Sequence, residues 1–358
     1  MPLHVARPKI LGLINEDASA WLIALLALLV GGLLTGLLAW ATLSAQDQQV
    51  VQRFQLLASE RKSRIAERFQ DQEQRLASLR RFFVNTQRVS REEFDGYTQP
   101  LLQRSQAYGW APLISHDQRA AFEQQVREEG IKDFSIIDLD AMGHAQVAEQ
   151  RAEYAPLLYK QALAVPAAPL GTDLLAQPAR RAVLQRARER GAMVVSRPMQ
   201  INGVEPPFSR GVLLVEPVMS KKRSDVEVGI PAGYVMALIN MRQLVTDGFP
   251  ASEQDDLVVD INGRAANGQR EAFYESTNAA ARDPLHYASM LRFADQVYDL
   301  DIQTSAAFER ANQPPVVSLV LMGGLLSLLL SALLYSLVSQ RQRALADAAV
   351  KAYCKPGG

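Results

Sequence analysis

The chain has 358 residues with 38 basic and 38 acidic side chains, so its formal net charge is zero. This balance argues against a nucleic-acid partner, because nucleic-acid-binding domains concentrate lysine and arginine. The length allows two domains of ordinary size or one large domain. Because Cys354 is the only cysteine, the chain cannot form an internal disulfide, which excludes a disulfide-stapled extracellular module.

Two long uncharged stretches bracket the chain, from Ala18 to Gln46 and from Ala311 to Gln340. A helix needs about 20 apolar residues to cross the hydrocarbon layer with its backbone hydrogen bonds satisfied internally. The sequence therefore predicts transmembrane helices at residues 18–45 and 314–339. The alternatives are a cleaved signal peptide for the first stretch, although signal cores are shorter at about 7–15 residues, and a buried core helix for the second.

Basic residues lie in the two short outer flanks of these helices: Arg7, Lys9, Arg341, Arg343, Lys351 and Lys355. Positive charge favours the cytoplasmic side, so we expect residues 1–17 and 340–358 in the cytoplasm and residues 46–313 in the periplasm. We interpret residues 340–358 as the stub of a signalling helix. The exported region then has no thiol, which suits a two-span protein of the bacterial inner membrane.

Residues 46–83 contain no proline or glycine and are predicted to form one long stalk helix. From Ile65 onward, apolar or neutral positions recur in steps of four and three: Ile65, Phe69, Gln72, Leu76, Leu79 and Phe83. This is the 3.5-residue period of a coiled-coil seam, so the pattern predicts a homodimer through the stalk helix. The alternative is that the stripe packs on the chain's own domain.

The segment after the stalk mixes helix and strand signals. Ser90-Arg91-Glu92-Glu93 is a capping-box signature that opens a helix. Further helices are expected at residues 116–129, 178–190 and 242–249, and strands or extended segments at 108–114, 134–139, 193–199, 211–219 and 233–239. Gly191 is expected to end the helix before it. Helices followed by clustered strands predict an α+β fold with an antiparallel sheet.

A smaller sheet unit is expected nearer the second span. Asp256 to Ile261 is a predicted strand, and Asn262-Gly263 is a hairpin turn signal. A further strand is expected from Phe293 to Gln303, after a polar stretch that includes Glu275 to Asp283. Two strand pairs within a short length of chain predict a small sheet domain.

An ordered series of residues runs from the end of the stalk into the predicted sheet region. The series comprises Phe82-Phe83, Val89 to Phe94, Tyr97, Leu101-Leu102, Trp110-Ala111-Pro112, Arg119 to Glu123, Gly130, Phe134, Glu153-Tyr154-Ala155-Pro156, Leu170 to Leu174, Arg180-Arg181, Ala187-Arg188, Gly191, Pro217-Val218 and Gly233-Tyr234-Val235. This series is similar to the CHASE family of extracytoplasmic sensory domains. The resemblance implies a long N-terminal stalk helix that carries tandem PAS-like domains. These would be a membrane-distal ligand-binding domain at 84–241 and a membrane-proximal domain at 242–313.

Two departures from the family pattern limit what the resemblance implies. The cytokinin-receptor branch has an aspartate where Ala152 stands, which places a cytokinin ligand in doubt. Such domains usually feed a histidine kinase, a diguanylate cyclase or a phosphodiesterase beyond the second span. Residues 341–358 carry no signature of these enzymes, so we expect the cytoplasmic output domain, or a partner kinase or cyclase, to be absent from this chain.

Residue types that carry catalysis or bind metals are scattered. None of the four histidines, His4, His116, His144 and His286, is followed by a metal-ligand residue three or four positions later. We therefore expect neither an enzyme nor a cofactor or metal site. The arginines of the helix at 178–190 are interpreted as a solvated helix face: Arg180, Arg181, Arg186, Arg188 and Arg190.

A small-molecule pocket needs apolar walls and a few polar anchors, and the distal domain offers candidates. The candidate ligand-binding residues are Trp110, Phe134, Tyr154, Leu157, Gly171, Asp173, Met219 and Met236. Gly171 would let the backbone approach a ligand, and Asp173 could accept a hydrogen bond from an amine or amide. For each large apolar residue the alternative is an ordinary place in the core.

These observations favour a membrane-anchored sensor that binds an unidentified small molecule in the distal pocket and transmits a conformational signal across the membrane. The alternative is a ligand-independent, membrane-anchored envelope protein that uses its periplasmic domain for protein–protein contacts.

Overall fold

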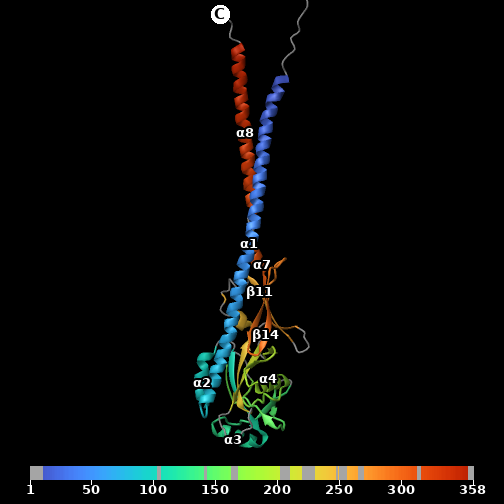
Figure 1. Cartoon of the computed structure of the whole chain (residues 1–358). Helices are drawn as coiled ribbons and strands as arrows, with labels where there is room; N and C mark the ends of the chain where they lie inside the picture. The colour runs from blue at the N-terminus through green and yellow to red at the C-terminus, as the bar shows by residue number, and fades with distance from the viewer. Residues whose placement is uncertain are drawn as a thin grey trace, which may run out of the picture. The chain divides into compact units, whose positions relative to one another are not determined.

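The computed structural model describes residues 11–102, 106–140, 143–162, 168–201, 210–219, 230–246, 249, 256–264, 270–312 and 316–353. Contacts divide the chain into two compact units, residues 1–53 with 311–358 and residues 54–310. The described structure combines helices with antiparallel sheets, and a long helix begins near the N-terminus (Figure 1). This confirms the predicted mixture of α and β structure.

The first unit is a pair of helices formed by the start of α1 (Leu11–Asn85) and by α8 (Val316–Tyr353). Each contains a stretch long and apolar enough to cross a membrane. Small residues lie where the helices meet: a Cβ added to Gly31 would lie 2.5 Å from Ser327 Oγ. Close approach through small residues is how apolar helices pack in a bilayer, where the hydrophobic effect does not drive association.

The predicted stalk is helical throughout, because α1 continues without a break to Asn85. Its apolar stripe is buried within the second unit: Ile65 and Leu76 are fully buried, and the rings of Phe69 and Phe293 lie 4.5 Å apart. The stripe is therefore not available as a dimer seam, and the alternative interpretation was the correct one. A repeat of this period places apolar side chains on one helix face, whatever covers that face.

The larger sheet of the second unit, here called the distal sheet, is entirely antiparallel. Its strand order is β6 (Tyr159–Ala162), β1 (Gln106–Pro112), β10 (Pro231–Asn240), β9 (Arg210–Met219) and β7 (Val194–Val195), with β8 (Met199–Gln200) also paired to β9. The strands predicted at 211–219 and 233–239 are confirmed. The strand predicted at 193–199 is divided in two, and Pro198, which has no backbone donor, lies in the interruption.

The two faces of the distal sheet are covered by different helices. One face meets α1, where Trp110 stacks on Phe83 with ring centroids 4.2 Å apart. The other face packs against α4 (Pro178–Arg190). The buried residues on this side form the distal core cluster: Ala111, Ala155, Leu157, Leu174, Leu175, Val183, Leu184, Ala187, Val194, Leu213, Val215, Tyr234 and Met236.

Short elements complete the part of the second unit that surrounds the distal sheet, here called the distal region (residues 84–241). They are α2 (Arg91–Thr98), η1 (Gln99–Leu101), η2 (His116–Gln118), α3 (Arg119–Glu128), and the strand pairs β2 (Ile114–Ser115) with β5 (Glu153–Tyr154) and β3 (Ile137–Leu139) with β4 (Ala145–Val147). The capping box is confirmed, since the Ser90 amide donates to Glu93 Oε2 at 2.9 Å and the Glu93 amide donates to Ser90 Oγ at 3.2 Å. Gly191 ends α4 with a φ of 59°, as expected.

A second antiparallel sheet, here called the proximal sheet, has the order β12 (Arg270–Glu275), β11 (Leu257–Arg264), β14 (Gln296–Thr304) and β13 (His286–Phe293). The short helices α5 (Met241–Thr246) and α7 (Ala306–Ala311) flank it in sequence. The predicted hairpin turn at Asn262-Gly263 is wrong, because both residues lie within β11 beside a register shift. Gly263 does not have a positive φ, and cross-strand pairing extends β11 past it.

The strand predicted from Phe293 also differs from the structure. Phe293 is the last residue of β13, and Ala294 and Asp295 turn the chain into β14. Ala294 has a φ of 49°, a left-handed conformation that non-glycine residues rarely adopt, and no glycine marks the turn in the sequence. The sequence therefore contains no local signal that marks this turn.

Candidate ligand-binding site

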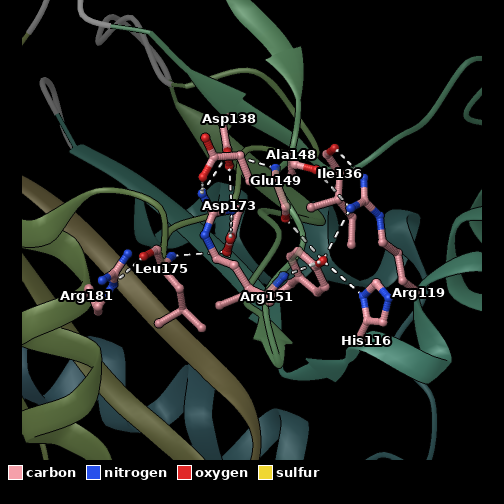
Figure 2. Close-up of polar contacts among 12 residues, drawn as sticks. His116, Arg119, Ile136, Asp138, Ala148, Glu149, Arg151, Asp173, Leu175 and Arg181 are labelled. Atoms are coloured by element: carbon pink, nitrogen blue, oxygen red, sulfur yellow. Dashed lines mark hydrogen bonds and ion pairs between the residues drawn. The ribbon is translucent and has the colours of Figure 1, made fainter.

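A buried charged network joins loops of the distal region (Figure 2). Arg151 donates from Nη1 to Asp138 Oδ1 at 3.0 Å and from Nη2 to Asp138 Oδ2 at 2.7 Å. Its Nη1 also donates to Asp173 Oδ2 at 3.3 Å. Such a two-bond fork is the strongest geometry available to an arginine–carboxylate pair. One guanidinium thus serves two carboxylates that are buried or almost buried.

The carboxylate of Asp173 is occupied by protein donors. Its Oδ1 accepts the amide of Ala155 at 2.9 Å and the amide of Leu175 at 3.1 Å. Burial raises the pKa of Asp173, while the two backbone bonds and Arg151 oppose that rise. This predicted ligand anchor ties the end of β5 to the loop before α4. Three of its roughly four acceptor positions are therefore used by donors from the protein itself.

Tyr154 is the centre of an adjoining hydrogen-bond network. Its hydroxyl donates to the carbonyl of Glu149 at 3.2 Å and accepts from the amide of Arg151 at 3.0 Å. His116 Nδ1 lies 3.2 Å from the same oxygen, and Arg119 Nη1 donates to it at 3.4 Å. The ring is fully buried. Tyr154 and Asp173, both predicted site residues, therefore belong to one connected polar network.

Leu157 and Met236 lie together on the sheet face that α4 covers. Both are members of the distal core cluster. A Cβ added to Gly109 would lie 2.9 Å from Leu157 Cδ1 and 3.1 Å from Met236 Cγ. The absence of a side chain at Gly109 lets both apolar side chains lie against the backbone of β1.

Phe134 and Gly171 meet at another point of the distal region. Gly171 has a φ of 83°, and a Cβ there would lie 2.2 Å from the carbonyl oxygen of Ser135. The same Cβ would be 3.6 Å from the ring of Phe134. No other residue fits this backbone. The close backbone approach predicted at Gly171 is thus made by the protein's own chain.

Trp110 and Met219 lie apart from the other predicted site residues. Trp110 is on the α1 side of the distal sheet, whereas Leu157 and Met236 are on the α4 side. Met219 ends β9 and is partly exposed. The structure therefore brings the predicted residues together in pairs and does not gather all of them around one point.

Sequence reasoning missed two cations beside the distal core cluster. Arg180 Nη1 is buried and has no hydrogen-bond partner among the residues that the structure describes. Lys160 Nζ donates to the carbonyl of Ala168 at 2.9 Å. Burial lowers the pKa of both groups. Helical spacing could have revealed Arg180, because it lies three and four residues before Val183 and Leu184, which face the sheet.

The interpretation of the α4 arginines as a solvated face is wrong. Arg186 Nε and Arg190 Nη1 lie 3.0 Å and 3.3 Å from the same carboxylate oxygen of Asp295, in the β13–β14 turn. Arg188 Nη1 donates to Glu153 Oε1 at 2.9 Å. The arginines are paired because their acidic partners, Asp295 and Glu153, come from sequence-distant elements that the composition of the helix does not reveal.

In the described part of the chain, no group of three or more histidine, cysteine, aspartate or glutamate side chains is placed to hold a metal ion.

Comparison with known protein families identifies a match. A family model described as CHASE domain matches residues 87–274, more than half of the chain. The matched range covers the distal sheet, α4 and the first strands of the proximal sheet. No curated protein matches the chain.

Proposed function

The chain belongs to the CHASE domain family, and we propose that it is a membrane-anchored periplasmic sensor module that binds a small molecule in its distal domain. CHASE is a sensory and non-catalytic domain. The observation that carries the proposal is the position of the matched region, residues 87–274, between two helices that are apolar enough to span a membrane. The signal would pass to a cytoplasmic output domain, or to a partner kinase or cyclase.

We assign the exterior region to tandem PAS-like domains, with the distal one at residues 84–241 and the proximal one at 242–313. The presence of two antiparallel sheets supports this division. Each sheet packs on α1, the distal sheet through Trp110 on Phe83 and the proximal sheet through Phe293 on Phe69. Because α1 contacts both sheets, a conformational change in one domain could be transmitted through this helix to the other.

The proposed topology places residues 46–313 in the periplasm and both termini in the cytoplasm, which the basic flanks support. A membrane-impermeant maleimide should label Cys354, the only cysteine, in inverted vesicles and not in intact spheroplasts. In a Cys354→Ser background, Val147→Cys should be labelled in intact spheroplasts and not in inverted vesicles. Val147 suits this test because it is 75% exposed on β4. Labelling of Cys354 in intact spheroplasts would contradict the topology.

Ligand binding is the part of the proposal that separates a sensor from a ligand-independent envelope protein. The test is a metabolite screen by thermal unfolding of the full chain in detergent micelles. A ligand present at about one hundred times its Kd stabilises a protein by about 2.7 kcal/mol, which is a readily measured shift. Failure of every metabolite class to stabilise the chain would favour a role in protein–protein contacts.

The β13–β14 turn offers a route for the signal. The amide of Ala294 donates to Glu73 Oε1 on α1 at 2.6 Å, and Asp295 Oδ1 accepts the amide of Val195 at 3.0 Å. Asp295 also pairs with Arg186 on α4. We propose that a shift of α4 on ligand binding moves this turn and thereby α1. A ligand drives such a shift only through different affinities for the two arrangements.

We keep the predicted homodimer through the stalk helix, with its contact moved to the exposed face of α1. Exposed positions recur there in steps of four and three: Leu56, Glu60, Ser63, Glu67, Gln70 and Gln74. In a Cys354→Ser background, Ser63→Cys and Gln70→Cys should each form an intermolecular disulfide in membranes. The control is Val147→Cys in the distal region, and equal cross-linking there would indicate random collision.

A further inference from the structure

Arg180 lies on the buried face of α4, in its first turn. It precedes Val183, Leu184 and Ala187 by three, four and seven residues, and all three are buried in the distal core cluster. Residues with this spacing share one helix face. The stem of Arg180 therefore points toward the distal sheet, and its Nη1 is buried without a hydrogen-bond partner among the described residues.

Lys160 lies on β6, at the edge of the distal sheet. It pairs directly with Gly109 on β1, so the two residues share a face of the sheet. A Cβ at Gly109 would touch Leu157 and Met236, which identifies that face as the one that α4 covers. The ammonium donates to the carbonyl of Ala168, which itself packs against the distal core cluster.

Three acids of the distal region are paired with other groups. Asp138 and Asp173 share Arg151, at 2.7 Å and 3.3 Å, and Asp173 also accepts two backbone amides. Glu153 pairs with Arg188 at 2.9 Å. In the described part of the distal region, no ion pair joins a carboxylate to Arg180 or Lys160. The unmatched charge beside the distal core cluster is therefore positive.

We propose that Arg180 and Lys160 bind the oxyanion group of a small ligand, a carboxylate or a phosphate, placed against the distal core cluster. This inference rests on the proposed sensor function and supplies its ligand class. A buried guanidinium nitrogen without a hydrogen-bond partner is costly, and a bound oxyanion removes that cost. The planar fork of arginine matches a carboxylate or a phosphate with two parallel hydrogen bonds.

The position of Arg180 also links the ligand to the proposed signal route. Arg180 is near the N-terminal end of α4, and Arg186 and Arg190 contact Asp295 from the C-terminal half of the same helix. An anion drawn to Arg180 would therefore act on the element that contacts the β13–β14 turn.

The test measures thermal unfolding of the full chain in detergent micelles at constant ionic strength. Acetate, succinate and citrate form the carboxylate arm, and inorganic phosphate and glycerol 3-phosphate form the phosphate arm. Acetamide and glycerol are uncharged controls. The variants are Arg180→Met and Lys160→Met, with Arg88→Met as the control because its side chain is 70% exposed in the same region.

We expect at least one arm to raise the Tm of the wild type and of Arg88→Met, but not that of Arg180→Met. Loss of a charged hydrogen bond should weaken anion binding about ten- to one-hundred-fold. Without an anion, Arg180→Met should unfold at a higher temperature than the wild type, because it removes a partly buried charge whose Nη1 has no hydrogen-bond partner among the described residues. The Tm measured without an anion distinguishes a variant that has lost anion binding from one that fails to fold.

Three results would overturn the inference. One is an anion-induced shift that persists in both Arg180→Met and Lys160→Met. Another is an Arg180→Met variant less stable than the wild type without anions, which would make Arg180 a structural group. The third is stabilisation of the wild type by uncharged metabolites and by neither anion arm. In that case the sensor function would stand and the ligand class would be wrong.

Discussion

Buried charges of two kinds lie within the distal region, and their partners distinguish them. Asp173 is fully buried but accepts two backbone amides and a guanidinium. The buried Nη1 of Arg180 has no such partner among the described residues. Burial alone therefore does not mark a functional group, because a fully paired buried charge is tolerated in the folded state whereas an unpaired one destabilises it.

Asp173→Ala should lower the free energy of unfolding by about 2–5 kcal/mol, because the amides of Ala155 and Leu175 would lose their acceptor in a buried site. Asp173→Asn should cost much less, since the amide oxygen can still accept both bonds and no charge is buried. Urea denaturation of the full chain in micelles measures both.

The control for Asp173 is Glu149→Gln, which alters another acid near Arg151 at a side chain that is 80% exposed. We expect a change of less than about 0.5 kcal/mol there. Equal losses for Asp173→Ala and Glu149→Gln would show that Asp173 does not organise the loop.

At the scale of elements, like charges meet across the proximal sheet. Asp260 on β11 pairs directly with Glu275 on β12 and with Asp301 on β14. Burial raises the pKa of Asp260, the amide of Ser276 lowers it, and the two neighbouring acids raise it further. Directly opposed like charges destabilise an antiparallel pair.

Asp260→Asn should therefore raise the free energy of unfolding at neutral pH by about 0.5–1 kcal/mol. The folded-state pKa lies above the usual aspartate value of 3.8, so protonation of Asp260 favours the folded state. That contribution is lost as pH rises through the folded-state pKa. Asparagine mimics the protonated acid, so the advantage should vanish near pH 3.8 and below. If Asp260→Asn remained more stable than the wild type at acid pH, the stabilisation would have another cause. The control is Asp283→Asn, because Asp283 is exposed.

Helix packing in the first unit gives a second prediction at this scale. A Cβ added to Gly323 would lie 2.5 Å from Thr35 Cγ2, whereas one added to the adjacent Gly324 would meet nothing within 4 Å. Gly323→Leu should separate α1 from α8, and Gly324→Leu should not. In a Cys354→Ser background, disulfide formation between Ala24→Cys and Ser331→Cys reports the contact, because Ser331 Oγ bonds the Ala24 carbonyl at 2.8 Å. Equal cross-linking in both leucine variants would refute this packing.

Local signals in the sequence identified several elements correctly. The capping box at Ser90, the glycine stop at Gly191 and the long α1 helix depend on residues close together in the chain. The partner of the stalk stripe and the β13–β14 turn depend on long-range packing that no local pattern contains. The same limit applies to the site: the residue types were visible, but whether Asp173 or Arg180 has a partner is decided only by the fold.

At the scale of the second unit, the β13–β14 turn is a joint between three elements. It contacts Glu73 on α1, Arg186 on α4 and Val195 on β7. Asp295 supplies two of these contacts and is almost completely buried. The turn therefore has more partners than a surface hairpin needs for its own stability.

Asp295→Ala should uncouple ligand binding from output. In a fusion with an intact output domain, the response to the stabilising ligand should fall at least tenfold, while the ligand-induced rise in Tm persists. The physical reason is that the contacts between α4 and the turn are lost, but Arg180 and the distal core cluster are unaltered. Asp299→Asn, in β14, is the control. A full response from Asp295→Ala would exclude this joint from signalling.

The burial of the α1 stripe decides where the sensory region can be cut. A recombinant fragment that began at residue 84 would keep both sheets but remove Phe69, Leu76 and Phe83, and Trp110 would lose the ring on which it stacks. Such a fragment would expose apolar surface and aggregate. A start at or before Phe54, the first residue of the second unit, would retain the helix that both sheets need to stay soluble.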